Sequence, residues 1–149
     1  MPMDVSGNVI LLVEDGEDEI LIFRKAYAKA EVTCRLQIVR DGLQALAYLG
    51  GAGAYTNREE YPLPGLIIMD INMPRMSGFE VLRWMRDQPA LKHLPTVMFT
   101  SSSFAADVKT AYDLAANSYL VKPINAADLV EIIKTLERYW FKMNVGPAI

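Results

Sequence analysis

The sequence has few of the residues that build cross-links and thiol- or imidazole-bound metal sites. Its 149 residues include one cysteine, Cys34, and one histidine, His93. A single cysteine excludes a disulfide within the chain and is typical of a reducing compartment, so we expect a cytoplasmic location. One cysteine and one histidine also cannot provide the four ligands of a structural zinc site. We expect Cys34 to be a small core residue in a strand and His93 to lie exposed in a loop.

Long apolar runs and clusters of one charge are lacking too. No apolar stretch approaches the roughly 20 residues of a membrane-spanning helix, and residues 1–8 do not form the basic and apolar regions of a signal peptide. The net charge is −3, and the lysines and arginines are scattered along the chain. The sequence therefore predicts a protein that binds neither a membrane nor a nucleic acid.

Short apolar runs alternate with helical patterns along a chain whose length suits one domain. The run at Asn8–Val13 is continuous, as in a strand that is buried on both faces, whereas Cys34–Val39 alternates between apolar and polar residues. The predicted strands are Asn8–Val13, Cys34–Val39, Leu66–Met69, Thr96–Phe99 and Ser118–Val121. This alternation predicts an α/β fold, in which a parallel sheet has helices on both faces.

Between the strands, apolar residues recur at helical spacing. The predicted apolar stripes are Ile20, Phe23, Tyr27 and Ala30; Leu43, Leu46 and Ala47; Val81, Leu82 and Met85; Val108, Ala111, Tyr112 and Ala115; and Leu129, Ile132, Ile133, Leu136 and Trp140. Asp41 is a candidate N-cap, and Ser77 with Glu80 forms a candidate capping box. Either Asn125 or Asp128 opens the last helix.

Residues Gly50–Pro64, rich in glycine, tyrosine and charge, are predicted to form a long flexible loop. The stretch GGAGAY at its start lacks the Gly-Lys-Ser/Thr ending of a phosphate-binding loop and does not directly follow an apolar strand. We therefore do not expect it to bind a nucleotide.

Polar residues follow the predicted strands at the edge where ligands bind in folds of this kind. These residues are Glu14 and Asp15, Asp70 and Asn72, Thr100 and Ser101, and Lys122 and Pro123. Three carboxylates at close range repel one another, and a cation such as Mg²⁺, which prefers oxygen ligands, relieves the repulsion. An aspartate can then act as a nucleophile toward a phosphoryl group, whose oxygens a lysine and a hydroxyl can bind. The set predicts phosphoryl transfer.

Each of these residues has a simpler explanation when it is taken alone. Glu14 and Asp15 fit the acid-rich start of a helix, Asp70 fits a turn, and Lys122 fits an ordinary surface charge. Thr100 fits a loop that contains an N-cap. The phosphoryl-transfer interpretation depends on all four signals occurring in this order, each directly after an apolar strand.

Together, the motifs LLVED, IIMDINMPRMSGFEVL, MFTS and YLVKP resemble the receiver domains of two-component response regulators over about Asn8–Glu137. The resemblance implies a flavodoxin-like, doubly wound (βα)5 three-layer sandwich with strand order 2-1-3-4-5. It implies that Asp70 is the phosphoacceptor, and that Asp15 binds Mg²⁺ directly and Glu14 through water. The main-chain carbonyl of Asn72 would be a further metal ligand.

The resemblance also assigns roles around the phosphoryl group. Lys122 would contact that group, and a cis peptide bond would join it to Pro123. Thr100 and Tyr119 match the switch pair, in which the hydroxyl moves toward the phosphoryl group and the aromatic ring turns inward. The implied function is that of a stand-alone signalling protein, phosphorylated by a sensor histidine kinase. Its chemistry would be limited to its own phosphorylation and dephosphorylation, so it would not be an enzyme with an external substrate.

The expected boundaries are an N-terminal tail at 1–7, the receiver domain at 8–138 and an aromatic extension of the last helix at 139–149. The long loop and the tail RYWFKMNVGPAI resemble the small regulators that pair with bacterial phytochrome kinases. Neighbouring residues of a helix point about 100° apart, so Tyr139, Trp140 and Phe141 cannot all face one core. We therefore expect a homodimer that uses the fourth and fifth helices, the fifth strand and the Trp140/Phe141 tail.

Three other functions fit the sequence less well. An aspartyl phosphatase usually has a second aspartate two residues after its nucleophile, where this chain has Asn72, which cannot act as a general acid. A pseudo-receiver usually lacks one of the acids, the threonine or the lysine. A flavin-binding domain of the same architecture would not present an acidic crevice to the flavin phosphate.

Overall fold

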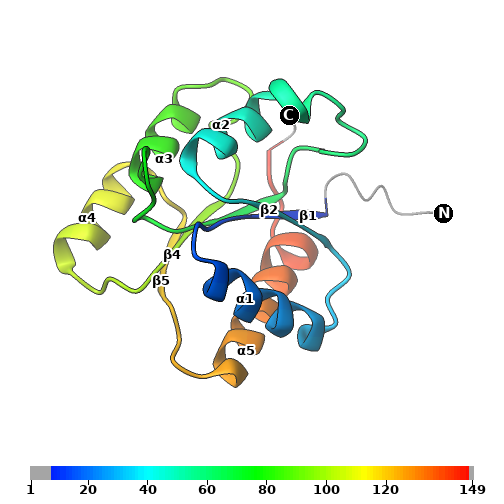
Figure 1. Cartoon of the computed structure of the whole chain (residues 1–149), viewed down its shortest axis with the longest axis vertical. Coiled ribbons are helices and arrows are strands. Elements are labelled where there is room, and N and C mark those ends of the chain that lie inside the picture. Colours follow the sequence, from blue (N-terminus) through cyan, green and yellow to red (C-terminus); the bar gives the residue numbers. More distant parts are fainter. Residues whose placement is uncertain (1–7, 148–149) are drawn as a thin grey trace.

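The computed structural model describes residues 8–147, so the predicted tail at 1–7 lies outside the described residues. A parallel sheet forms the centre of the fold (Figure 1). Its strands are β1 (Val9–Val13), β2 (Arg35–Val39), β3 (Leu66–Met69), β4 (Thr96–Thr100) and β5 (Ser118–Val121). Their order is β2-β1-β3-β4-β5, which confirms the predicted topology.

Helices cover both faces of the sheet. They are α1 (Glu17–Ala30), α2 (Gly42–Gly50), α3 (Gly78–Arg86), α4 (Ala105–Asp113) and α5 (Ala126–Glu137). Figure 1 shows α1 and α5 together on one face, and α2, α3 and α4 on the other. Successive side chains of a strand point to opposite faces, so Leu11 packs beneath α2 and α3 while Ile10 and Leu12 pack against α1 and α5. Burial of β1, β3 and β4 on both faces explains why they are continuously apolar.

Helix starts follow the local sequence signals. Asp41 caps α2 by accepting a hydrogen bond from the main-chain N–H of Gln44. Ser77 and Glu80 form the predicted capping box of α3. Asn125, rather than Asp128, is the N-cap of α5. All three caps stand where a loop from the carboxyl edge of the sheet enters a helix, so they also fix where those loops end.

Two predicted helix faces are wrong. In α2 the buried residues are Gly42, Ala45, Tyr48 and Leu49, whereas Leu43 is 48% exposed. In α4 only Ala111 of the predicted stripe is buried, and Tyr112 is 50% exposed. The α2 sequence GLQALAYLG is apolar on most sides, so spacing alone fits several faces, and packing against β1 and α3 selects one of them.

The loop after α2 is more ordered than the sequence predicts. It contains a short 3-10 helix, η2 (Gly53–Tyr55). The guanidinium group of Arg58 donates hydrogen bonds to the carbonyls of Tyr48, Leu49 and Tyr61. Tyr48 and Leu49 lie in the last turn of α2, where carbonyls run out of helical donors, and Tyr61 lies in the loop itself. Arg58 therefore ties the loop to the helix.

The aromatic tail continues α5 as a single π-helical segment, η3 (Arg138–Met143). Trp140 and Phe141 pack partly against the core between the sheet and α1/α5, whereas Tyr139 is 47% exposed. Lys142 forms an ion pair with Glu137, five residues earlier, which matches π-helical spacing. As expected, the three aromatics do not all face the core.

Cys34 is buried and His93 is exposed, as predicted. Within residues 8–147, no helix combines the length and the apolar character that crossing a membrane would require.

Candidate functional site

The predicted site residues gather at the carboxyl edge of the sheet, one step beyond the strands. Asp70 N donates to Val13 O at 3.0 Å and Lys122 N donates to Thr100 O at 2.8 Å, so the sheet hydrogen bonding extends to the site. Because β1 and β3 pair with Val13 beside Met69, Glu14 and Asp70 emerge next to each other. The strand order thus brings together side chains from distant parts of the sequence.

Lys122 is the centre of this site. Its Nζ donates to Glu14 Oε1 at 2.7 Å and to Asp70 Oδ2 at 3.1 Å, and it lies 6.0 Å from the centre of the Phe99 ring. The three charged side chains are only 14%, 5% and 11% exposed for Lys122, Glu14 and Asp70, respectively. Burial by itself lowers the pKa of Lys122, but Glu14 and Asp70 outweigh it and raise that pKa. The lysine is therefore held as a cation between two carboxylates.

The pKa of Glu14 is raised, because burial outweighs the hydrogen bonds from Lys122 and from the N–H of Gly16. One ligand oxygen from each of Glu14, Asp15 and Asp70 lies within 4.8 Å of the others. Asp15 is exposed while the other two are buried, so the cluster opens to solvent on one side. Hard oxygen donors around an accessible point fit a divalent cation such as Mg²⁺ or Mn²⁺.

Asp70 is oriented by its own main chain. Its Oδ1 accepts a hydrogen bond from Ile71 N at 2.8 Å, while Oδ2 faces Lys122. Asn72 follows two residues later and is exposed in the β3–α3 loop. The side chain of Asp70 is thus fixed in direction, and Asn72, whose carbonyl is the other predicted metal ligand, lies on the adjacent loop.

The two predicted switch residues are linked through Ser102. Thr100 is 1% exposed, and its hydroxyl oxygen accepts from Ser102 N at 3.4 Å. The hydroxyl of Tyr119 donates to Ser102 O at 2.9 Å. The Ser102 hydroxyl in turn donates to Asp107 in α4 at 2.6 Å. The β4–α4 loop is therefore the physical connection between the strand end and the aromatic ring.

One expectation about the site is wrong. None of the peptide bonds among residues 8–147 is cis, so Lys122 and Pro123 are joined by a trans bond. Trans is the intrinsically favoured form before proline, by about 0.5–1 kcal/mol. Lys122 reaches both carboxylates from this backbone conformation.

The motif resemblance places Gly78 in the turn beside the phosphorylated strand, but sequence reasoning did not identify the contacts by which Asp41, Arg75 and Gly78 support the site. Asp41, identified only as a helix cap, also pairs with Arg75 in the β3–α3 loop at 2.6 Å. Gly78 packs so closely on the main chain of Asp70 and Ile71 that there is no space for a Cβ atom. The only available signal was that Arg75 and Gly78 lie in the block that carries Asp70, because neither contact has a periodic pattern.

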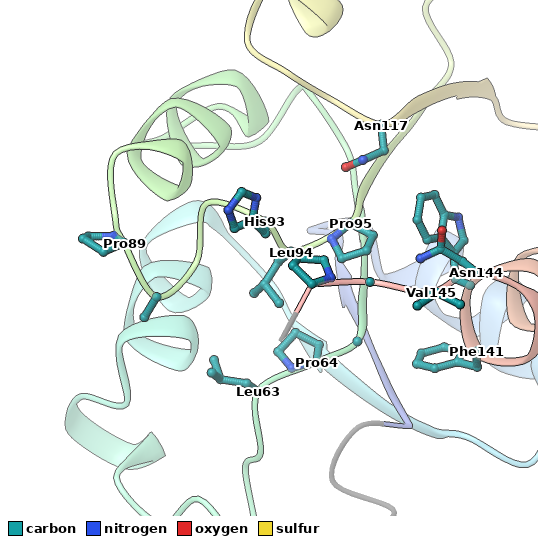
Figure 2. Close-up of a pocket in the computed structure, with 15 residues that line it drawn as sticks. Leu63, Pro64, Pro89, His93, Leu94, Pro95, Asn117, Phe141, Asn144 and Val145 are labelled. Carbon is teal, nitrogen blue, oxygen red and sulfur yellow. The ribbon is translucent and has the colours of Figure 1, made fainter. Parts of the chain in front are cut away.

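A large hollow lies elsewhere in the described chain. It is a groove of about 1050 Å³ at the amino edge of the sheet, where Pro64, Pro95 and Asn117 precede strands. In Figure 2, Phe141 and Val145 of the tail face Pro64 and Pro95 across it. His93 is its only titratable lining residue, so the groove offers little chemistry. A smaller pocket of about 90 Å³ lies beside Glu14 and Lys122 at the opposite edge.

Comparison with known proteins agrees with this geometry. Residues 10–134 match the response regulator receiver domain family. Response regulator Rcp1 of Synechocystis sp. is 37% identical over 140 residues, which cover 94% of this chain and 93% of Rcp1. The chain therefore belongs to the response regulator receiver domain family.

Solved structures agree as well. The phosphorylated cyanobacterial phytochrome response regulator RcpA superposes with a TM-score of 0.85 at 35% identity, covering 95% of this chain and 99% of RcpA. The Mn²⁺-bound form of Rcp1 gives a TM-score of 0.81 at 37% identity, with coverage of 95% and 99%. A response regulator in red light signalling of R. palustris superposes with a TM-score of 0.88 at 34% identity, covering 95% of this chain and 99% of that protein.

Proposed function

We propose that this chain is a stand-alone response regulator that accepts a phosphoryl group on Asp70 from a sensor histidine kinase. The observation that carries the proposal is the placement of Lys122 between Glu14 and Asp70, with Asp15 beside them at the open edge. The family membership and the near-complete coverage of Rcp1 support it. The protein would catalyse only its own phosphorylation and dephosphorylation.

The divalent ion in this proposal is Mg²⁺, which Asp15, Asp70 and the carbonyl of Asn72 would hold, with Glu14 contributing through water. The oxygen donors fit it, and Rcp1 has been solved with Mn²⁺. When bound, it neutralises charge on the incoming phosphoryl group.

The residues of the chain would carry out the transfer itself. A carboxylate oxygen of Asp70 attacks phosphorus, the bond from phosphorus to the donor nitrogen breaks, and the leaving imidazole takes up a proton. Ile71 N and Lys122 already fix the carboxylate in direction, which lowers the entropic cost of attack. The ammonium group of Lys122 then binds a phosphoryl oxygen, and the Thr100 hydroxyl binds another.

The expected partner is a histidine kinase of the phytochrome type. RcpA is described as a cyanobacterial phytochrome response regulator, and the R. palustris relative acts in red light signalling. Both relatives are covered almost to full length. Such a relay would operate in the cytoplasm.

The output would be a change of conformation or assembly at the face made by α4, β5 and α5. Tyr119 in β5 is hydrogen-bonded to the carbonyl of Ser102 and Asp107 in α4 to its hydroxyl, so a movement of the loop after Thr100 would reach both elements. Tyr112 in α4, Val121 in β5 and Tyr139 in the adjoining tail segment η3 are about half exposed. A second copy of the chain would cover this face together with the tail.

Intact-mass measurement after incubation with acetyl phosphate and Mg²⁺ tests the proposal. We expect wild type to gain one phosphoryl group, and Asp70→Asn or removal of the metal with EDTA to abolish the gain. Asp87→Asn, an exposed aspartate at the end of α3, is the matched control and should be phosphorylated normally. Light scattering on the same samples reports assembly. No gain in wild type, when a known receiver is phosphorylated in parallel, would refute the proposal.

A further inference from the structure

The loop between β3 and α3 is fixed firmly at both of its ends. Ile71 N donates to Asp70 Oδ1, and Gly78 N donates to Ile71 O, both at 2.8 Å. Between these points lie Asn72, Pro74 and Arg75, which are exposed. The position of the Asn72 carbonyl therefore depends on what holds the middle of the loop.

Arg75 provides such a contact. Its guanidinium Nη2 lies 2.6 Å from Asp41 Oδ2, and its main chain has a φ of 68°, in the left-handed region that side chains disfavour. A residue keeps this conformation only when its surroundings impose it. The ion pair to Asp41 is one such constraint.

Asp41 is itself immobilised. Its side chain is 8% exposed, and Oδ1 accepts from Gln44 N at 2.7 Å as the cap of α2. This hydrogen bond and Arg75 together lower the pKa of Asp41, because both favour the ionised carboxylate. Arg75 is thus tied to the end of a helix and not to another mobile side chain.

A second contact lies next to the first. Gly42 follows Asp41, and a Cβ atom placed there would come within 2.7 Å of the Met76 carbonyl oxygen and 2.8 Å of its Cβ. The absence of a side chain at Gly42 lets Met76 settle directly on α2. The start of α2 therefore supports the loop at two successive positions, Arg75 and Met76.

We propose that the Asp41–Arg75 ion pair is a positioning device for the metal site, holding the β3–α3 loop so that the Asn72 carbonyl faces Asp15 and Asp70. Neither residue touches the metal or the phosphoryl group. The inference rests on the proposed function, because it assigns a role to a loop next to a proposed metal site.

Removing Arg75 distinguishes a positioning role of this residue from the plain effect of its positive charge on cation binding. Loss of a positive charge near an acidic site should by itself strengthen cation binding. Loss of a positioning contact should weaken it, by about tenfold if the contact acts like other outer-shell partners of metal ligands. The two explanations predict changes of opposite sign in the Mg²⁺ dissociation constant.

Calorimetric titration of wild type, Arg75→Ala and Arg75→Gly with Mg²⁺ is the experiment. We expect weaker binding in both variants, while the phosphorylation rate at saturating Mg²⁺ stays near that of wild type. The glycine variant adopts the left-handed backbone without strain, so it keeps the test valid if the alanine variant folds poorly. Thermal unfolding shows whether each variant is folded.

Two further variants act as controls. Arg40→Ala removes the same charge from an exposed arginine that pairs with Glu17 at 3.4 Å, outside the loop, and should not weaken binding. Asp41→Asn keeps a good helix cap but loses the ion pair, and should weaken binding as Arg75→Ala does. Because both changes break one contact, the double variant should be no weaker than either single variant.

The outcomes distinguish this inference from the proposed function. Unchanged or tighter Mg²⁺ binding in the folded Arg75 variants, or additive losses in the double variant, would overturn the inference. If wild type itself bound no Mg²⁺ and accepted no phosphoryl group, the proposed function would fail first.

Discussion

Replacing Lys122 with methionine tests whether the site is a balanced charge cluster. Methionine keeps most of the length of the side chain but removes the ammonium group that lies 2.7 Å from Glu14 and 3.1 Å from Asp70. Two largely buried carboxylates then face each other without a cation. Breaking a buried pair by removing one partner typically costs 3–5 kcal/mol. Because Lys122 is 14% exposed, we expect a loss of about 3 kcal/mol, at the low end of that range.

That loss can be measured as a melting temperature. For a chain of this size, 1 kcal/mol corresponds to about 2–4 °C, so Lys122→Met should melt about 6–12 °C below wild type in EDTA. A cation bound to the folded state stabilises it by about 2.7 kcal/mol at one hundred times its dissociation constant. Since the variant lacks the competing ammonium group, Mg²⁺ should raise its melting temperature more than that of wild type.

Lys109→Met is the matched control for this variant. Lys109 pairs with Asp113 at 2.6 Å, but its side chain is 78% exposed, so solvent screens the pair and its loss should have little effect. Differential scanning calorimetry with EDTA and with Mg²⁺ measures both variants. If Lys122→Met had the same melting temperature as wild type in EDTA, the folded state would not need the lysine to balance the two carboxylates. That result would refute the charge-balance argument.

Two other predictions concern the packing around the site and the loop. Tyr48→Phe removes the hydrogen bond from the buried hydroxyl to Pro62 O, 2.9 Å long, and should lower the free energy of unfolding in urea by about 1 kcal/mol; an unchanged midpoint would mean that the bond contributes nothing. Gly78→Ala places a Cβ atom against the Asp70 carbonyl, so both the melting temperature and the Mg²⁺ affinity should fall. Gly50→Ala, at a helical position with open space, should leave both unchanged or slightly improved, and equal behaviour of the two glycine variants would contradict the close-approach argument.

The parts of the fold that could be predicted are those with a local or periodic signal. Continuous burial of β1, β3 and β4 leaves a continuous apolar run, and the caps at Asp41 and Ser77 depend on residues only three positions away. Motif resemblance then supplied the strand order, which no single strand encodes. The strand order in turn explains why Glu14, Asp70 and Lys122 meet.

The parts that could not be predicted depend on contacts between segments with no periodic pattern. The buried face of α2 is chosen by its neighbours, because the helix is apolar on most sides. Glu137 is another example: it is 6% exposed, and its carboxylate accepts hydrogen bonds from the N–H and the hydroxyl of Thr33, more than one hundred residues away. In the sequence it is one more charged residue near the end of an amphipathic helix.

The position of α5 between the two ends of the sheet links the site to the tail. Lys122 lies at the carboxyl edge, Asn125 caps α5 three residues later, and the helix runs to Glu137, where the π-helical tail begins. The tail then lines the groove at the amino edge, as Figure 2 shows. The helix is packed on the sheet through Leu129, Ile133 and Leu136. In the proposed function, a displacement of Lys122 on phosphorylation would reach Trp140 and Phe141 through α5.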